Sequence, residues 1–158
     1  MRLTTSAHGL ARAERMFADM VGGHQSNEEA LLDRLPYVLD LLAGVTRTID
    51  RESKGQRTDA FAAWWSSVDR SLGKSLTDIR NSELKALESR SRLSQTTALS
   101  VKATDYPRMR VADGDTVTII TWQFVNGPLN GESVIPALKG YLDTLGEVLR
   151  DAEEKLAQ

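Results

Sequence analysis

Cysteine is absent from this chain of 158 residues, and histidine occurs only twice, as His8 and His24. Without cysteine the chain has no disulfide framework and no zinc site with thiolate ligands. The two histidines lie sixteen residues apart in different predicted segments, and no Glu-x-x-His pair of the kind that holds metal ions in helical bundles is present. We therefore expect neither a metal ion nor a cofactor.

Long apolar runs are also missing. No stretch approaches the roughly 18 apolar residues that span a bilayer, and the N-terminus lacks the apolar region of a signal peptide. The 22 acidic and 20 basic side chains leave a net charge of -2, which does not suit a protein that mainly wraps duplex DNA. These features predict a cytoplasmic protein with no membrane segment.

The common catalytic signatures are missing as well. Gly73-Lys74-Ser75 imitates the end of a phosphate-binding P-loop, but Val68 replaces the glycine that this motif needs five residues earlier. The chain has no Gly-x-Ser-x-Gly elbow for a hydrolase nucleophile, and Asp113-Gly114-Asp115 lacks the further oxygen ligands of a calcium loop. These motifs identify no catalytic residue.

What the chain does contain is helical periodicity in four segments, at about 6–21, 26–53, 58–90 and 133–156. In each segment apolar residues recur mainly at spacings of three and four, which a helix presents as one continuous stripe. A chain of this length buries enough surface to build a core without disulfides or metals. The stripe residues include Leu10, Ala13, Phe17 and Met20; Leu31, Leu35, Val38, Leu42, Val45 and Ile49; Phe61, Trp65, Val68, Leu72, Leu76 and Ile79; and Leu138, Leu142, Leu145, Leu149 and Ala152.

Two residues interrupt these stripes. Pro36 removes a backbone donor in the second segment, so we expect a kink near Arg34 or a division into a short helix and a longer one from about Leu35. Gly73 weakens the third segment, which is then either one long helix over about 59–89 or two shorter helices that meet near Gly73.

Between about 96 and 125 the pattern becomes typical of strands. The stretches 97–102 and 111–125 are rich in valine, threonine, isoleucine and aromatic residues. An isolated two-stranded hairpin is marginally stable in water, so this one must lie on the helices or pair with another chain. The fold class that follows is mainly α: a single domain, 1–158, built as an antiparallel bundle of four to five helices, with a β-hairpin or small antiparallel sheet inserted before the last helix.

Trp64 and Trp65 are adjacent in the third helical segment. One helical position turns a side chain by about 100°, so Trp65 follows the core stripe and Trp64 lies at its margin. We therefore place Trp65 in the core. Trp64 is a candidate for a homodimer interface, where large aromatic side chains contribute much of the contact energy.

Positive charge gathers in the middle of the chain. Residues 80–110 hold seven basic and three acidic side chains, a local balance of +4. The basic stretch includes Arg80, Lys85, Arg90 and Arg92, which are candidates for binding RNA or a protein partner. The alternative is that these charges form an ordinary solvated face.

Arg80 emerges between Leu76 and Leu84, four residues away on either side, at the edge of the apolar stripe. In one interpretation its aliphatic stem lies on the core and its guanidinium reaches water or Glu83. In the other, the arginine is held in a groove between helices to grip a phosphate, and Asn81 supports the backbone or the partner chain.

Together these features resemble the HEPN superfamily of helical domains, many of which act in toxin-antitoxin and anti-phage systems. The resemblance covers about residues 10–90 and rests on the order of the helices, on Trp64-Trp65 and on the Arg-Asn pair within Ile79-Arg80-Asn81. In active members the arginine is followed about four to six residues later by a histidine, and two such motifs meet across a dimer to cleave RNA without a metal ion.

This sequence departs from the HEPN pattern at that place. Residues 81–87 contain no histidine, and Lys85 stands where the histidine is expected. Cleaving RNA needs a group that exchanges a proton near neutral pH, whereas a lysine, with an ordinary pKa of about 10, remains a cation unless it is heavily desolvated. The resemblance then implies that Arg80 and Asn81 bind an anion or serve the structure, and that Lys85 has no catalytic role.

We therefore expect a non-catalytic HEPN-like bundle that binds another macromolecule, RNA or protein, as a homodimer in a toxin-antitoxin or phage-defence setting. One alternative is a metal-independent ribonuclease with an atypical motif. Another is a structural or phage-type accessory subunit with no affinity for nucleic acid.

Overall fold

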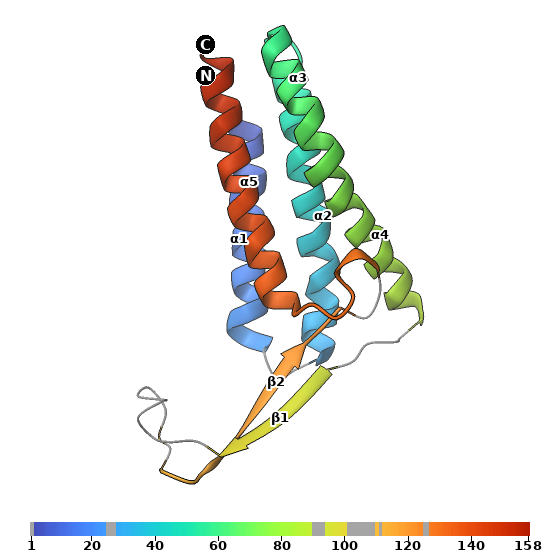
Figure 1. Ribbon diagram of the computed structural model, residues 1–158, viewed down its shortest axis with the longest axis vertical. Coiled ribbons are helices and arrows are strands. Elements are labelled where there is room, and N and C mark those ends of the chain that lie inside the picture. Colours follow the sequence, from blue (N-terminus) through green and yellow to red (C-terminus); the bar gives the residue numbers. More distant parts are fainter. Residues whose placement is uncertain (1, 25–27, 90–93, 101–109, 111, 125–126) are drawn as a thin grey trace.

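Helices dominate the computed structural model, which describes residues 2–24, 28–89, 94–100, 110, 112–124 and 127–158 (Figure 1). The prediction of a mainly α-helical fold is confirmed. Within the described residues, no helix is both long and apolar enough to cross a membrane. The helices are α1 (Thr4–His24), α2 (Glu28–Ser53), α3 (Asp59–Val68), α4 (Lys74–Ser89) and α5 (Val134–Leu156), and the π turn η1 (Asp69–Gly73) joins α3 to α4.

The long helices run alternately up and down and lie side by side (Figure 1). α1 packs along α2, α5 packs against both, and α4 packs on the opposite flank of α2. α2 is therefore the central helix of the bundle. Its predicted stripe is buried throughout, from Leu31 to Ile49, because apolar side chains at these spacings face its neighbours on both flanks.

The other predicted stripes also supply the core. Phe17, Val68 and Leu72 are half-buried and pack against it from its margin. Trp122, Phe124 and Leu129 join the core from outside the long helices. The buried stripe residues of α1, α3, α4 and α5 are Leu10, Ala13, Met20, Phe61, Trp65, Leu76, Ile79, Leu138, Leu142, Leu145, Leu149 and Ala152.

Neither predicted interruption divides a helix. α2 continues through Pro36 from Glu28 to Ser53, so the division into two helices is not observed. α3, η1 and α4 follow one another without a gap, which selects the single long segment over two separate helices. Gly73 ends the π turn, and the Asp69 carboxylate occupies the place that a Cβ at Gly73 would fill.

Two strands lie between α4 and α5. β1 (Ser94–Ser100) and β2 (Thr116–Trp122) pair antiparallel, with Ser94 opposite Trp122 and Ser100 opposite Thr116. The ladder extends away from the helices (Figure 1). Residues 101–109 and 111, which belong to the hairpin expected over 96–125, lie outside the described residues.

The chain returns to the bundle directly after β2. Trp122 and Phe124 are buried, and the Phe124 carbonyl accepts a hydrogen bond from the Gly131 N–H at 2.7 Å. The 3-10 turn η3 (Gly127–Leu129) then approaches α4 closely. Gly127 has a φ of +72°, and a Cβ there would lie 2.5 Å from the side chain of Ser82, so glycine is required on both counts.

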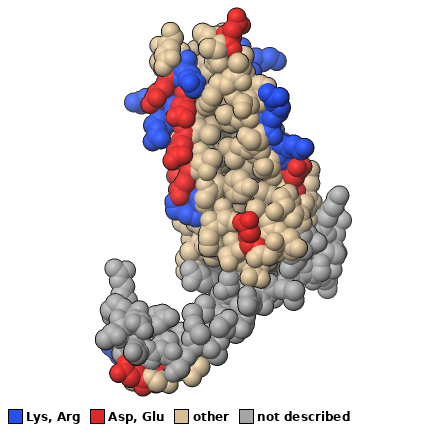
Figure 2. Space-filling model, viewed as in Figure 1, with Lys and Arg blue, Asp and Glu red and all other residues tan. Residues whose placement is uncertain are grey.

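Charged side chains are unevenly spread over the face seen in Figure 2. They lie along the two edges of the bundle, and a strip between α5 and α4 carries almost none. On α5, Asp143, Glu147 and Asp151 are exposed and follow one another at intervals of four residues, which places the three carboxylates on one side of that helix.

Candidate functional site

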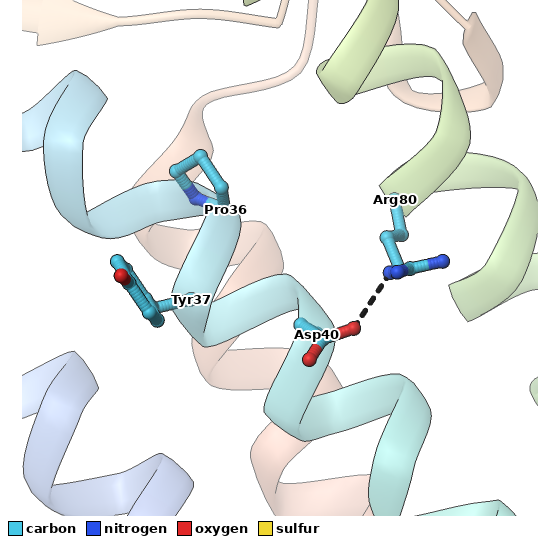
Figure 3. Close-up of a pocket in the computed structure, with 4 residues that line it drawn as sticks. All are labelled: Pro36, Tyr37, Asp40 and Arg80. Carbon is cyan, nitrogen blue, oxygen red and sulfur yellow. Dashed lines mark ion pairs between the residues drawn. The ribbon is translucent and has the colours of Figure 1, made fainter.

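Arg80 forms an ion pair with Asp40, which joins α4 to the central helix α2 (Figure 3). The Arg80 Nε lies 2.7 Å from the Asp40 Oδ1. The same Nε is shielded from solvent and has no hydrogen-bond partner, because its N–H does not point at that oxygen. The contact is therefore an attraction between charges rather than a linear hydrogen bond, and it partly neutralises the guanidinium.

The position of Arg80 follows from its neighbours in the sequence. Leu76 and Ile79 are buried, so the next residue leaves α4 at the edge of the core and its stem lies on apolar surface. The Arg80 side chain is 32% exposed and the Asp40 side chain 57% exposed. Of the two interpretations of Arg80, the structure combines parts of both: the arginine lines a pocket, and a carboxylate offsets its charge.

The pocket beside this ion pair has a volume of about 220 Å³ and is lined by Pro36, Tyr37, Asp40 and Arg80. Asp40 and Arg80 point toward each other, and the Tyr37 ring points away from them (Figure 3). Tyr37 is 67% exposed, an unusual degree of exposure for a large aromatic side chain. We refer to these four residues as the Tyr37 pocket.

Tyr37 did not enter the sequence-based set of candidate residues. A signal for it exists, because Tyr37 lies outside the apolar stripe of α2, next to the buried Val38. An aromatic residue on the polar side of an amphipathic helix is a candidate for an interface. The sequence did not predict Asp40 as the partner of Arg80, because the two residues are forty positions apart and no local spacing connects them.

The remaining candidates for binding RNA or a partner follow Arg80 along the chain. The Arg80 Nη1 donates a weak hydrogen bond to Asn81 Oδ1 at 3.5 Å, and Asn81 is exposed. The backbone of Lys85 belongs to α4, but its side chain lies outside the described part of the chain. Arg90 and Arg92 lie wholly outside it. The structure thus brings Arg80 and Asn81 together and adds Pro36, Tyr37 and Asp40.

The two adjacent tryptophans have different surroundings. Trp65 is 3% exposed and stacks on Phe61, whose ring centroid lies 6.4 Å away. Trp64 is half-buried and meets Phe61 edge-on, and the Lys155 ammonium of α5 lies 5.5 Å from its ring centroid. Trp64 therefore already joins α3 to α5 within one chain, while part of its surface remains accessible.

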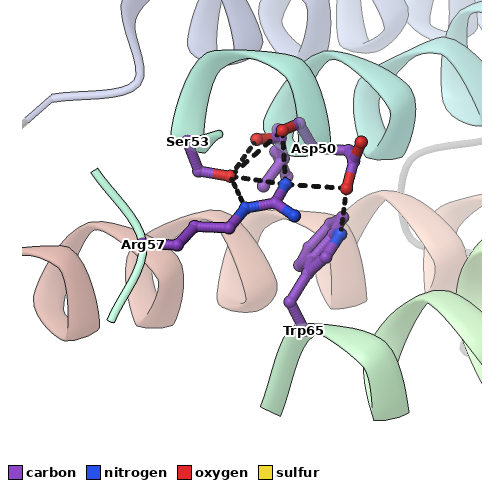
Figure 4. Close-up of polar contacts among 5 residues, drawn as sticks. Asp50, Ser53, Arg57 and Trp65 are labelled. Atoms are coloured by element: carbon purple, nitrogen blue, oxygen red, sulfur yellow. Dashed lines mark hydrogen bonds and ion pairs between the residues drawn. The ribbon is translucent and has the colours of Figure 1, made fainter. Parts of the chain in front are cut away.

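A polar cluster fixes Trp65 and the turn between α2 and α3 (Figure 4). The Arg57 Nη2 lies 2.7 Å from Asp50 Oδ1 and also donates to the Asp50 carbonyl, and its Nε donates to Ser53 Oγ at 3.1 Å. Trp65 Nε1 donates to the same Asp50 carboxylate at 2.9 Å. The hydrogen bond from Arg57 holds the pKa of Asp50 below its ordinary value, and the bond from Trp65 contributes further.

The described residues of the Tyr37 pocket offer few chemical groups. Among the described residues that line it are one aromatic hydroxyl, one cation and one carboxylate, and the last two are engaged with each other. His8, the only histidine with a described side chain, is exposed on α1. In the part of the chain that the structure describes, no group of three or more histidine, aspartate or glutamate side chains is arranged to hold a metal ion.

Comparison with protein families, with curated proteins and with solved structures finds no match to this chain.

Proposed function

We propose that this protein is a non-catalytic, HEPN-like helical bundle that acts by binding another macromolecule, which it contacts at the Tyr37 pocket. The observation that carries the proposal is Tyr37 itself, a large aromatic side chain that is 67% exposed beside a cation already held in place by Asp40. Tyrosine and arginine are the residue types on which binding energy concentrates at protein interfaces.

The absence of a proton-exchanging group supports binding over catalysis. Metal-independent cleavage of RNA needs a general acid and base near neutral pH, and the HEPN position for it holds Lys85 in this chain. Arg80, the other residue of that motif, has its charge offset by Asp40 at 2.7 Å. An arginine paired in this way is less able to stabilise the charge that develops on a phosphate during cleavage.

The size of the pocket supports a macromolecular partner. Sites for whole small molecules measure roughly 300–1,000 Å³. At about 220 Å³, the Tyr37 pocket falls below that range and matches one inserted side chain or one nucleobase of a larger partner. The exposed Tyr37 ring points away from Asp40 and Arg80, so it offers contact area to a partner that extends beyond the pocket.

Photo-crosslinking in the native host tests this proposal. A photoreactive phenylalanine analogue at position 37 is expected to give a discrete cross-linked species, which disappears when Arg80→Ala is added. The matched control carries the same analogue at Thr144, which is exposed on α5. Digestion of the species with nuclease or protease identifies RNA or protein as the partner. Equal cross-linking patterns from positions 37 and 144 would contradict the proposal.

A ribonuclease assay separates binding from the catalytic alternative. We expect purified protein to leave mixed RNA intact in the presence of a metal chelator. Metal-independent cutting that Arg80→Ala abolishes would replace the proposal with an atypical HEPN ribonuclease. Absence of both cutting and cross-linking at position 37 would favour the structural or accessory subunit.

We also propose that the protein works as a homodimer. A two-stranded ladder such as β1–β2 is marginally stable alone, and it extends away from the helices (Figure 1).

The nearly charge-free strip between α5 and α4 (Figure 2) has the low charge of an interface core. Trp64 on α3 and Tyr141 on α5 are half-buried. Light scattering at micromolar concentration is expected to give twice the chain mass of 17.5 kDa, and a monomer would refute this part.

A further inference from the structure

A second, larger pocket lies between α2 and the π turn η1. Its volume is about 430 Å³, within the usual range for small-molecule sites of roughly 300–1,000 Å³. None of its described lining residues belongs to the Tyr37 pocket. We call it the Arg51 pocket, and its lining is Arg47, Asp50, Arg51, Lys54 and Asp69.

Three cationic side chains line the Arg51 pocket, two from α2 and one from the turn that follows it. Arg47 and Arg51 are four residues apart on α2, so they project from the same face, and Lys54, the first residue after the helix, joins them in the lining. Arg47 pairs with Asp40 at 3.9 Å, where both side chains are more than half exposed, and its Nε donates to the Ala43 carbonyl at 3.3 Å. Such an exposed ion pair contributes about 0–1 kcal/mol, so little free energy is lost when Arg47 leaves Asp40 to contact a bound anion.

The Asp50 carboxylate does not oppose an anion in this pocket. The Arg57 guanidinium lies 2.7 Å from Asp50 Oδ1, and Trp65 donates to the same oxygen (Figure 4). In this ion pair the Arg57 side chain is 21% exposed and the Asp50 side chain 51% exposed. The charge of Asp50 is therefore offset chiefly by Arg57, from the turn between α2 and α3, and to a smaller extent by Lys54.

The partial negative charge at the C-terminal end of α2 is also offset by hydrogen-bond donors. The last carbonyls of a helix carry partial negative charge, which disfavours an anion nearby. Here Arg57 donates to the Asp50 carbonyl, and the buried Ser53 hydroxyl donates to the Ile49 carbonyl at 2.7 Å. Once Asp50 is offset by Arg57, the described lining residues keep three positive charges and one negative charge, that of Asp69.

Asp69 begins the π turn, and its carboxylate lies against Gly73. π turns inside α-helices are frequent at functional sites. This one packs beside α2 and contributes Asp69 to the lining of the pocket. Removing the Asp69 carboxylate from the lining makes the field in the pocket more positive.

We infer that the Arg51 pocket binds a small phosphate-bearing anion, with the two guanidinium groups and the ammonium of Lys54 contacting its phosphate oxygens. Arginine presents two parallel donors to phosphate, and lysine adds a compact charge. This inference goes beyond the proposed binding of a macromolecule at the Tyr37 pocket and does not depend on it.

Isothermal titration with inorganic pyrophosphate at low ionic strength tests the inference. We expect saturable binding of one ligand per chain, weakened about tenfold or more in the double variant Arg51→Gln/Lys54→Gln. The matched control is Lys139→Gln/Arg150→Gln, which removes one arginine and one lysine from exposed positions of α5 and is expected to leave binding unchanged. Thermal melts of each variant establish that the fold is intact.

The variant Asp69→Asn gives a result of opposite sign. It removes the opposing charge with little change of shape and is expected to tighten pyrophosphate binding severalfold. Adenosine triphosphate and a short RNA serve as further probes. Equal affinity for pyrophosphate and the nucleotide assigns recognition to the phosphates alone, and tighter binding of the nucleotide assigns the ligand to that class.

Three outcomes would overturn the inference. They are no saturable binding of pyrophosphate or nucleotide, an equal loss of affinity in the α5 control, and binding of RNA alone. Each is distinguishable from failure of the proposed function, because that is judged by cross-linking at position 37 and not by anion affinity.

Discussion

The Glu52 carboxylate accepts hydrogen bonds from both the backbone N–H and the hydroxyl of Ser6, at 2.9 and 2.7 Å. It also accepts from the Thr5 N–H at 2.8 Å. Glu52 lies near the end of α2, and the donors lie in the first turn of α1, so a residue of one helix supplies the N-terminal cap of its antiparallel neighbour.

Replacing Glu52 with alanine is expected to lower the free energy of unfolding by about 1 kcal/mol, because the first donors of α1 lose their acceptor. Urea denaturation followed by circular dichroism measures the change. The matched control is Glu14→Ala, which removes an exposed glutamate from the middle of α1, where the backbone donors are already bonded. Equal losses in the two variants would mean that the cap contributes nothing measurable.

Stability is also expected to depend on acid pH through two carboxyl groups. The pKa of Glu52 is lowered from 4.5: burial opposes the shift, and the hydrogen bonds from Thr5 and Ser6 outweigh it. The pKa of Asp50 is lowered from 3.8, chiefly by Arg57. Groups with a lowered folded-state pKa stabilise the fold above their unfolded pKa, and this contribution disappears as the pH falls through the folded-state pKa.

The measurement is a series of urea titrations between pH 7 and pH 3. We expect the free energy of unfolding to change little near neutrality through these groups and to fall below about pH 4.5. Glu52→Gln is expected to flatten part of that fall, since the amide does not titrate. A pH dependence that is the same in Glu52→Gln and in the unaltered chain would contradict the assignment to this group.

Trp65→Phe is expected to destabilise the protein by about 1–3 kcal/mol, because the Asp50 carboxylate loses the indole donor at 2.9 Å and part of a buried side chain is removed. Trp64→Phe is the control, as it shortens a neighbouring indole that is only half-buried. Thermal denaturation compares the two variants. A larger loss in Trp64→Phe than in Trp65→Phe would show that the polar cluster does not stabilise this end of the bundle.

The ion pair between Arg80 and Asp40 is expected to contribute little to stability. A double-mutant cycle with Arg80→Ala and Asp40→Asn should give a coupling energy of about 0.2–1 kcal/mol, since both side chains are partly exposed. Arg80→Ala alone is expected to cost more than Asp40→Asn, because the arginine stem also packs on the core edge. A coupling energy well above 1 kcal/mol would make the pair a structural element and weaken its use as a binding site.

The sequence was informative where its periodicity is strong. Every residue of the stripe predicted for α2 is buried. Trp65 lies in the core as predicted, and its neighbour Trp64 lies at the core's margin. Helical spacing works here because each helix contacts the core along a single face. The contacts of Arg57 could not be derived in that way, because a guanidinium that reaches back over the end of α2 follows from the turn geometry and not from a repeat.

The site was less predictable than the fold. Arg80 stood out because a charge interrupts an apolar stripe, but its counterion Asp40 lies on another helix, and only the packing of α4 on α2 brings them together. The continuity of the helix across Gly73 was one of two alternatives that the sequence left open. A single glycine costs a helix only about 1 kcal/mol, which is too small a penalty to decide between them without tertiary contacts.

The π turn η1 also sets the angular phase of everything that follows it. On a regular α-helix, Phe61 and Arg80 are nineteen positions apart and would point about 100° away from each other. The wider turn absorbs roughly one position, so α4 is rotated back relative to α3, and Arg80 on α4 pairs with Asp40 on α2. Deleting one residue of 69–73 would therefore leave α3 and α4 helical but turn a different row of α4 side chains toward Asp40. This short stretch thus sets the rotation of α4 relative to α3.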